Sequence, residues 1–522
     1  MIINIVSGKL FNLDKIYSNF NDFNEIILQK IKNIINIDNC IIKYIYKEEI
    51  INSDNYNNFI NDFNDTTIIT IIFQNIPIIY STNGAFAVNN NGDVITWGNP
   101  DYGGDSSEVQ SQLQAWQQCN KYIIKIYSTS YAFAVINEDG DVITWGDPRY
   151  GGDSSKVKLQ LQNILKIYSN NFAFAAIDNN GNVITWGNSE CGGDSSEVQS
   201  QLLKWQQCNK NIIQIYSTSR AFAAINEDGA VITWGNPWYG GNSSKVQSQL
   251  LKLQLCKQNI VEIYSTSSAF AAINNDGNVI TWGHSIYGGN SSSVKLQLQH
   301  ITKIYSNEGA FAAIDNNNNV ITWGDPGHGG DSSKVQSQLL KWQICKQNII
   351  KIYSTNSAFA AINEEGNVIT WGNPICGGNS SKVQHKLCKK NIVEIYSTEW
   401  AFAAINEDGA VITWGNSYHG GDSSKVKLCD WQLFKITKSY STQSAFAAID
   451  KYGNVITWGN SCGGDSSEVE LELRKIKEIY STSSAFAAIN EDGTIITWGD
   501  SNYGGDSSRV QSQLLGSNAR KI

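Results

Sequence analysis

One segment is repeated ten times along this chain of 522 residues, and its copy at residues 215–250 reads IYSTSRAFAAINEDGAVITWGNPWYGGNSSKVQSQL. An I-T-W-G signature marks each copy, at Trp97, Trp145, Trp186, Trp234, Trp282, Trp323, Trp371, Trp414, Trp458 and Trp498. The spacings are 48, 41, 48, 48, 41, 48, 43, 44 and 40 residues. Self-similarity at such a period is typical of propellers and solenoids, in which each unit buries its apolar face against its neighbours.

Each unit is predicted to contain three strands. In the second copy, I-Y-S at 126–128 forms a short first strand, and A-F-A-V-I at 132–136 forms a second strand with apolar residues on both faces. A strand of that kind is covered on both sides. An Asp-Gly turn at 139–140 leads into V-I-T-W-G, so the second and third strands are predicted to be antiparallel neighbours.

A G-G-[D/N]-S-S element follows the third strand in every copy, from Gly103 to Gly504. No lysine follows at the P-loop position, so we interpret the element as a tight turn that leads into a helix rather than as a phosphate site. Val109, Leu113 and Trp116 give that helix one apolar face. In the 41-residue intervals the segment shortens to V-K-L-Q-L, as at 157–161, which fits a strand equally well.

The repeated phenylalanines and tryptophans are predicted to form the core. Each such ring buries about 150–250 Å². A series of aromatic side chains that binds ligands is the alternative.

These motifs resemble the repeats of the regulator of chromosome condensation family of β-propellers. The resemblance covers A-F-A-A-I, the Asp-Gly turn, V-I-T-W-G and the glycine-rich loop, roughly over residues 78–514. It implies a mainly β, propeller-like array of three-stranded units with a short helix each. Members of the family tend to have G-Q-L-G where this chain has G-G-[D/N]-S-S. Most members have seven blades. Ten units are therefore compatible with one large ring, a seven-unit ring with three extra units, or an open superhelix.

The first 76 residues are predicted to form a separate domain. Alternating residues on either side of Gly8 indicate a hairpin, Asp22 and Glu25 begin a helix, and apolar strands follow at 41–46 and 66–73. This order resembles the small α+β ubiquitin-like (β-grasp) fold. The resemblance implies that Ile45 lies on the strand that ubiquitin presents to its receptors; the alternative is an ordinary strand residue. We therefore expect a ubiquitin-like domain at 1–76, the repeat domain at 77–514 and a tail at 515–522.

Composition narrows the classes of partner. The net charge of −9 and the presence of only five arginines argue against nucleic acid. Ten cysteines without a C-x-x-C motif indicate reduced thiols and no metal site, and no cofactor motif is present. The sequence has neither a signal peptide nor a stretch of ~18 apolar residues, which predicts a cytoplasmic or nuclear protein without membrane association.

The loop between the first and second strands and the loop that leaves the third strand are expected to emerge at the same end of each unit. Both loops vary between units. They carry aromatic, histidine and arginine residues, the side chains that dominate protein interfaces. We predict that these residues bind a partner: Tyr102, Tyr131, Arg149, Phe172, Arg220, Trp238, Tyr287, His328, Trp400, Tyr418 and His419. Drift in unselected loops is the alternative. The acidic E-D-G turns at the other end are interpreted as turn chemistry.

The function predicted from these features is a non-enzymatic protein-interaction scaffold, linked through its N-terminal domain to components of the ubiquitin pathway. The alternative is guanine-nucleotide exchange on a small GTPase, the activity of the family's founding members. No catalytic residues are predicted, because none of the five histidines stands at a recognisable nucleophile spacing from a cysteine or serine.

Overall fold

The computed structural model describes residues 2–5, 10–12, 40–46, 49–51, 68–75, 77–90, 92–388, 391–424, 426 and 435–516. The chain divides into two compact units, residues 1–78 with 491–494, and residues 79–490 with 495–522. None of the helices among the described residues is long and apolar enough to cross a membrane.

The N-terminal unit contains a mixed sheet with the strand order β2-β1-β5-β3-β4. Its strands are β1 (Ile2–Ile5), β2 (Leu10–Asn12), β3 (Cys40–Tyr46), β4 (Glu49–Ile51) and β5 (Ile68–Asn75). β1 pairs antiparallel with β2 and parallel with β5, and β3 pairs antiparallel with β5 and β4. Ile45 lies in β3 opposite Ile50 of β4. The helix predicted from Asp22 onward lies outside the described residues.

The second unit contains ten three-stranded antiparallel sheets, one for each repeat. We number the repeats 1 to 10 in the order of their tryptophans. The first strands are β6 (Ile78–Ser81), β9 (Ile123–Ser128), β12 (Ile164–Ser169), β15 (Ile212–Ser217), β18 (Ile260–Ser265), β21 (Ile301–Ser306), β24 (Ile349–Ser354), β27 (Ile392–Ser397), β30 (Ile436–Ser441) and β33 (Ile476–Ser481). The second strands are β7 (Ala85–Asn90), β10 (Ala132–Asn137), β13 (Ala173–Asp178), β16 (Ala221–Asn226), β19 (Ala269–Asn274), β22 (Ala310–Asp315), β25 (Ala358–Asn363), β28 (Ala401–Asn406), β31 (Ala445–Asp450) and β34 (Ala485–Asn490). The third strands are β8 (Asp93–Gly98), β11 (Val142–Gly146), β14 (Val183–Gly187), β17 (Val231–Gly235), β20 (Val279–Gly283), β23 (Val320–Gly324), β26 (Val368–Gly372), β29 (Val411–Gly415), β32 (Val455–Gly459) and β35 (Ile495–Gly499).

The repeated aromatic residues form the core, as predicted. In repeat 2, Phe133 pairs with Trp145 across the hairpin, and their rings stack with centroids 5.2 Å apart. Phe133 is fully buried, and so is every residue of β10. The strand is covered on both faces because the sheets of neighbouring repeats pack against it. The alternative of a ligand-binding aromatic ladder is therefore wrong.

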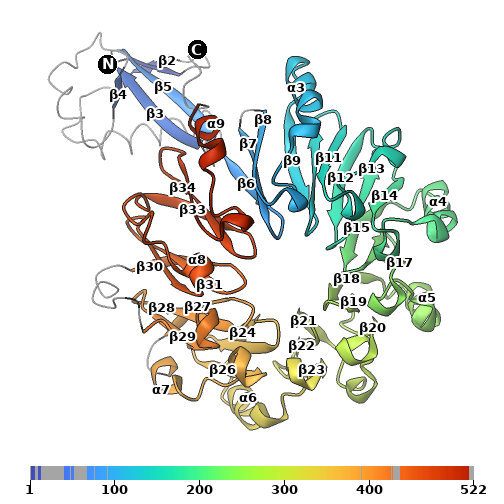
Figure 1. Cartoon of the computed structure of the whole chain (residues 1–522). Coiled ribbons are helices and arrows are strands. Elements are labelled where there is room, and N and C mark those ends of the chain that lie inside the picture. The colour runs from blue at the N-terminus through green and yellow to red at the C-terminus, as the bar shows by residue number, and fades with distance from the viewer. Residues whose placement is uncertain are drawn as a thin grey trace. The chain divides into compact units, whose positions relative to one another are not determined.

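A hydrogen bond between neighbouring repeats recurs throughout the array. The indole Nε1 of Trp145 donates to the carbonyl of Gly103 in repeat 1, at 3.0 Å. The equivalent donor in repeat 1, Trp97, reaches Gly504 in repeat 10, and the amide of Ser483 donates to the carbonyl of Asn83. The ten repeats therefore form one closed ring, in which the sheets follow one another from β6 to β34 (Figure 1). No strand is exchanged at the junction, because the sheet of each repeat contains its own three consecutive strands.

The first glycine of each pair is required at this contact between neighbouring repeats. Gly103 has a φ of 87°, and a Cβ at this position would lie 2.7 Å from Cδ2 of Phe133 in the next repeat. Only glycine combines that backbone conformation with so close an approach.

The helix after the glycine pair forms in some repeats only. Helices of nine residues are α3 (Gln110–Gln118), α4 (Gln199–Gln207), α5 (Gln247–Leu255) and α6 (Gln336–Ile344), and shorter ones are α7 (Gln384–Leu387) and α9 (Gln511–Gly516). In the 41-residue intervals the segment forms single 3-10 turns, η5 (Ser155–Val157) and η11 (Ser292–Val294), so it is neither the helix nor the strand considered above. The buried Leu161 stands four residues after Val157, as Leu113 stands after Val109, and fills the same place in the core.

Candidate functional site: a belt of side chains at one end of the ring

The loop after the first strand and the loop after the third strand lie side by side, as expected. In repeat 2, the hydroxyl of Thr129 donates to the carbonyl of Tyr150 at 3.1 Å and accepts from the amide of Ala132 at 3.0 Å. Threonine or asparagine makes the same bridge in other repeats, for example Asn170 to Cys191 at 2.7 Å. Because side chains tie the two loops together, the residues that the loops carry are held at fixed positions.

Two positions of each repeat form a belt around this end of the ring. The first lies two residues after the bridging threonine or asparagine: Gly84, Tyr131, Phe172, Arg220, Ser268, Gly309, Ser357, Trp400, Ser444 and Ser484. The second directly precedes the glycine pair and belongs to a short helical turn: Tyr102, Tyr150, Cys191, Tyr239, Tyr287, His328, Cys376, His419, Cys462 and Tyr503. The turns are η2 (Pro100–Tyr102), η4 (Pro148–Tyr150), η6 (Ser189–Cys191), η8 (Pro237–Tyr239), η10 (Ser285–Gly289), η12 (Pro326–His328), η14 (Pro374–Gly378), η15 (Ser417–His419), α8 (Ser461–Gly464) and η16 (Ser501–Tyr503).

Belt residues contact one another from repeat to repeat. Tyr102 of repeat 1 stacks on Tyr131 of repeat 2 at 4.8 Å between ring centroids, and Tyr503 of repeat 10 lies 6.2 Å from Tyr102 on its other side. Further along, the guanidinium of Arg220 lies over the rings of Phe172 and Tyr239, at 5.0 and 5.1 Å. The aromatic contacts of the belt therefore continue across the junction between the last and the first repeat, where the two tyrosine rings are tilted by 47°.

Large and small belt residues compensate for one another. A Cβ on Gly84 would lie 2.8 Å from Cγ of Tyr102, and a Cβ on Gly309 would lie 2.6 Å from Cγ of His328 and 3.0 Å from Cδ1 of Tyr287. A glycine thus stands where neighbouring rings fill the space. At these two positions the size of the belt residue is therefore limited by its neighbours.

The predicted binding residues divide into two groups in the structure. Eight are belt members that pack against their neighbours: Tyr102, Tyr131, Phe172, Arg220, Tyr287, His328, Trp400 and His419. Arg149, Trp238 and Tyr418 instead occupy the tips of the helical turns. Trp238 is 72% exposed and Tyr418 is 78% exposed.

Arg149 is held by its own turn. Its Nη2 lies 2.7 Å from Oδ2 of Asp147, and its Nε donates to Oδ1 of the same carboxylate at 3.1 Å. These hydrogen bonds hold the pKa of Asp147 below its ordinary value.

Several residues of this end were missed by the sequence reasoning. Tyr150, Tyr239 and Tyr503 occupy the same position as Tyr102, and Ile286 and Ile375 occupy the same tip position as Trp238. Alignment of the ten repeats on their glycine pairs would have identified all five.

Histidines at this end make specific contacts. His284 replaces the asparagine or aspartate that caps the helical turn in the other repeats, makes no capping hydrogen bond, and lies 4.8 Å from the ring of Tyr287. Nδ1 of His328 lies 2.7 Å from Oδ2 of Asp325.

His419 and Ser444 form a histidine–serine pair that the sequence spacing did not indicate. Nδ1 of His419 lies 2.7 Å from Oγ of Ser444, while its ring stacks on Trp400 at 5.5 Å between centroids. Among the described residues no carboxylate is hydrogen-bonded to this imidazole, so the pair lacks the orienting acid of a hydrolase triad. Throughout the residues that the structure describes, no group of three or more histidine, cysteine, aspartate or glutamate residues is placed to hold a metal ion.

A polar funnel of about 870 Å³ opens at the centre of the belt end. It is lined by the S-[T/N]-x segment of every repeat, such as Ser128, Thr129 and Ser130. The hydroxyl of Ser128 donates to the carbonyl of Ser81 in the preceding repeat at 2.8 Å, and serines of other repeats do the same. Of the described residues that line the funnel, Glu308 and Glu399 are the charged ones.

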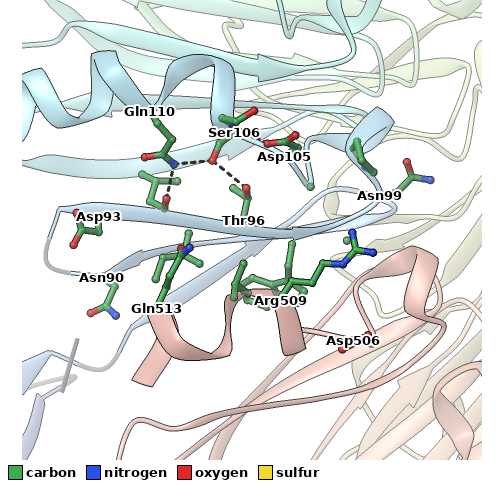
Figure 2. Close-up of a pocket in the computed structure, with 18 of the residues that line it drawn as sticks. Asn90, Asp93, Thr96, Asn99, Asp105, Ser106, Gln110, Asp506, Arg509 and Gln513 are labelled. Carbon is green, nitrogen blue, oxygen red and sulfur yellow. Dashed lines mark hydrogen bonds between the residues drawn. The ribbon is translucent and has the colours of Figure 1, made fainter. Parts of the chain in front are cut away.

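A second cavity, of about 1060 Å³, lies at the junction of repeats 1 and 10. Figure 2 shows Gln110 and Ser106 on one side of β8, and Arg509 and Gln513 of the last repeat on the other. Gln110 donates to Ser106 and to the carbonyl of Val94, at 2.9 and 3.1 Å. The second of these bonds satisfies one carbonyl of β8. None of the predicted binding residues lines this cavity.

No family model and no curated protein matches the sequence. Similar solved structures include yeast RCC1 (Prp20) bound to Kap60, with 14% identity over 65% of this chain and 82% of that chain and a TM-score of 0.31. They also include human WBSCR16, with 14% identity, coverage of 59% and 80%, and a TM-score of 0.30. The ectodomain of the Arabidopsis thaliana receptor kinase ACR4 has 11% identity, coverage of 57% and 95%, and a TM-score of 0.29. The assignment of a ten-repeat propeller rests on the strand pairing and ring closure of the chain itself.

Proposed function

We propose that this chain is a non-enzymatic protein-interaction scaffold whose partner binds the belt end of the ring. The observation that carries the proposal is the exposure of Trp238 and Tyr418 at the tips of loops that are fixed by hydrogen bonds. Tryptophan and tyrosine are the residues that most often dominate binding energy at protein interfaces. A rigid scaffold that presents variable loops is a common arrangement for recognition.

The opposite end of the ring offers less to a partner. Five of its ten turns carry two adjacent acidic residues, and several of these charges are already paired. Lys121 lies 3.0 Å from Asp139 and 2.8 Å from Asp141, and Lys210 lies 2.8 Å from Asp228. This pairing supports the interpretation of these residues as turn chemistry.

The test is capture of partners from native lysate with matched variants of the full chain. Trp238→Ser with Tyr418→Ser removes two exposed rings from the belt end. Tyr122→Ser with Tyr452→Ser removes two exposed rings from elsewhere on the surface and serves as the control. We expect partners to be lost with the first variant and retained with the second, while both melt like the unchanged protein. Retention of every partner by both variants would sink the proposal.

Regulation of a small GTPase is the alternative, because exchange activity is what resemblance to the regulator of chromosome condensation family implies. Stimulated release of labelled nucleotide from a captured GTPase would replace the scaffold proposal with this one.

For the N-terminal domain we propose a ubiquitin-like docking role. The motivation for this proposal is the antiparallel pairing of β1 with β2 and the parallel pairing of β1 with β5. Ile45→Ala in the full chain is then expected to abolish binding to an immobilised ubiquitin-receptor domain. Unchanged binding would leave Ile45 an ordinary strand residue.

A further inference from the structure

The negative charge of the funnel is concentrated at one side of its rim. Glu308 belongs to repeat 6 and Glu399 to repeat 8, and Asn356 of repeat 7 stands between them in the same position of the repeat. Backbone hydrogen bonds fix both: the amide of Ser267 donates to the carbonyl of Glu308 at 3.0 Å, and the amide of Asn356 donates to the carbonyl of Glu399 at 3.0 Å.

Within the described part of the chain these two carboxylates form no ion pair with a lysine or arginine. Burial and repulsion by Glu399 raise the pKa of Glu308, against the opposing effect of His328. A cation placed between the two carboxylates would remove this repulsion.

Exposed apolar tips are concentrated in the same sector of the ring. The tip residues of repeats 4, 5, 7 and 8 are Trp238, Ile286, Ile375 and Tyr418, of which Ile286 is 58% and Ile375 60% exposed. The tips of repeats 1, 2, 3 and 10 are instead Asp101, Arg149, Glu190 and Asn502. The apolar tips and the acidic rim therefore occupy repeats 4 to 8, whereas the tips of repeats 1, 2, 3 and 10 are polar.

Two further features shape this sector. The tip of repeat 6, which is also the repeat of Glu308, is Gly327 and therefore has no side chain. Trp400, which directly follows Glu399, is 37% exposed and stacks on His419. An indole beside a carboxylate is a favourable environment for a lysine or arginine head group, because the ring face and the carboxylate both attract a cation.

We propose that repeats 4 to 8 bind a basic segment of a protein partner, with a lysine or arginine side chain between Glu308 and Glu399 and flanking apolar residues on the tips. The proposal rests on the proposed function and narrows the chemistry of its partner. A free polyamine would satisfy the carboxylates but would leave Trp238 and Tyr418 uncovered, whereas a peptide that alternates basic and apolar residues satisfies both. The net charge of −9 also favours the approach of a basic segment.

The direct test uses a short fluorescein-labelled peptide of alternating leucine and arginine, with a leucine–glutamate peptide as its control. Glu308→Gln with Glu399→Gln is the test variant of the full chain. Glu138→Gln with Glu190→Gln changes the net charge equally at exposed positions outside the sector. We expect the test variant to weaken binding of the basic peptide about tenfold and to reduce its salt dependence, and the control variant to bind like the unchanged protein.

Three results would overturn the proposal. These are equal weakening of peptide binding in both variants, equal binding of the two peptides, or a loss of spermine binding without a loss of peptide binding in the Glu308→Gln, Glu399→Gln variant. Native-partner capture with the same variants separates this proposal from the function on which it rests. Partners lost with Trp238→Ser and Tyr418→Ser but kept with the glutamine pair would preserve the scaffold and reject the basic segment. Partners kept by both variants would reject both.

Discussion

The indole Nε1 of Trp97 donates a hydrogen bond to the backbone carbonyl of Gly504, which is 3.1 Å away and 407 residues later in the chain. Between consecutive repeats the same bond joins Trp145 to Gly103 and Trp282 to Gly240, at 3.0 and 3.1 Å. The first repeat therefore completes the last one with the contact that every other repeat makes with its neighbour. This equivalence leads to a test of ring closure in solution.

Trp97→Phe is expected to destabilise the repeat domain as much as Trp282→Phe does. Each change removes the indole donor and leaves a buried glycine carbonyl without its partner, which costs about 1–3 kcal/mol. Urea unfolding of the two variants measures the comparison. A loss with Trp282→Phe but none with Trp97→Phe would show that the array is open in solution.

Gly504→Ala is expected to be more destabilising than Gly181→Ala. Both glycines have positive φ, at 92° and 80°, so both substitutions carry the same conformational penalty. A Cβ at 504 would in addition lie 2.6 Å from Cδ2 of Phe86, whereas nothing lies within 4 Å of a Cβ at 181. We expect the overpacking to add about 1–3 kcal/mol, measured by thermal unfolding. Equal losses in the two variants would contradict the packing at the ring junction.

Tyr480, in the first strand of repeat 10, is expected to make the free energy of unfolding depend on pH in the alkaline range. Burial, and secondarily the charge of Glu478, raise the pKa of Tyr480 to about 12. The unfolded chain therefore loses this proton first, near pH 10, so the contribution of the protonated phenol is complete below that pH and is lost as the pH rises through 12. Unfolding free energies between pH 9 and 12 are expected to fall more steeply for the unchanged protein than for Tyr480→Phe. Parallel curves would contradict the assignment.

The stacked belt tyrosines are expected to be energetically coupled. A double-mutant cycle with Tyr102→Leu and Tyr131→Leu measures their interaction, for which stacked rings predict about 0.5–1.5 kcal/mol. Tyr102→Leu combined with Tyr287→Leu is the control, because these two residues belong to repeats 1 and 5. Additive effects in both cycles would mean that the belt rings do not pack in solution.

Much of the fold follows from local sequence. The Asp-Gly turn, the continuous apolar second strand and the aromatic pair such as Phe133 and Trp145 predict the antiparallel sheets and their core, because these signals act within one repeat. The helix was less predictable. Val157 and Leu161 satisfy the same core position as Val109 and Leu113, so the apolar pattern is retained whether or not a helix follows.

The candidate site was predictable in position but not in organisation. Strand direction alone assigns Trp238 and Tyr102 to the same end of the ring. Only the structure separates them into an exposed tip and a belt residue packed on Tyr131, because that difference depends on contacts between repeats.

By itself, the sequence determined the repeat, its three strands, its aromatic core and the end at which its variable loops emerge, since all of these depend on residues close together in the chain. The tertiary structure decided that ten repeats close into one ring. It also decided that Glu308 and Glu399 both line the central funnel. The physical reason is that both outcomes depend on the small rotation between neighbouring sheets, which accumulates over the array and which nearly identical repeats do not encode individually.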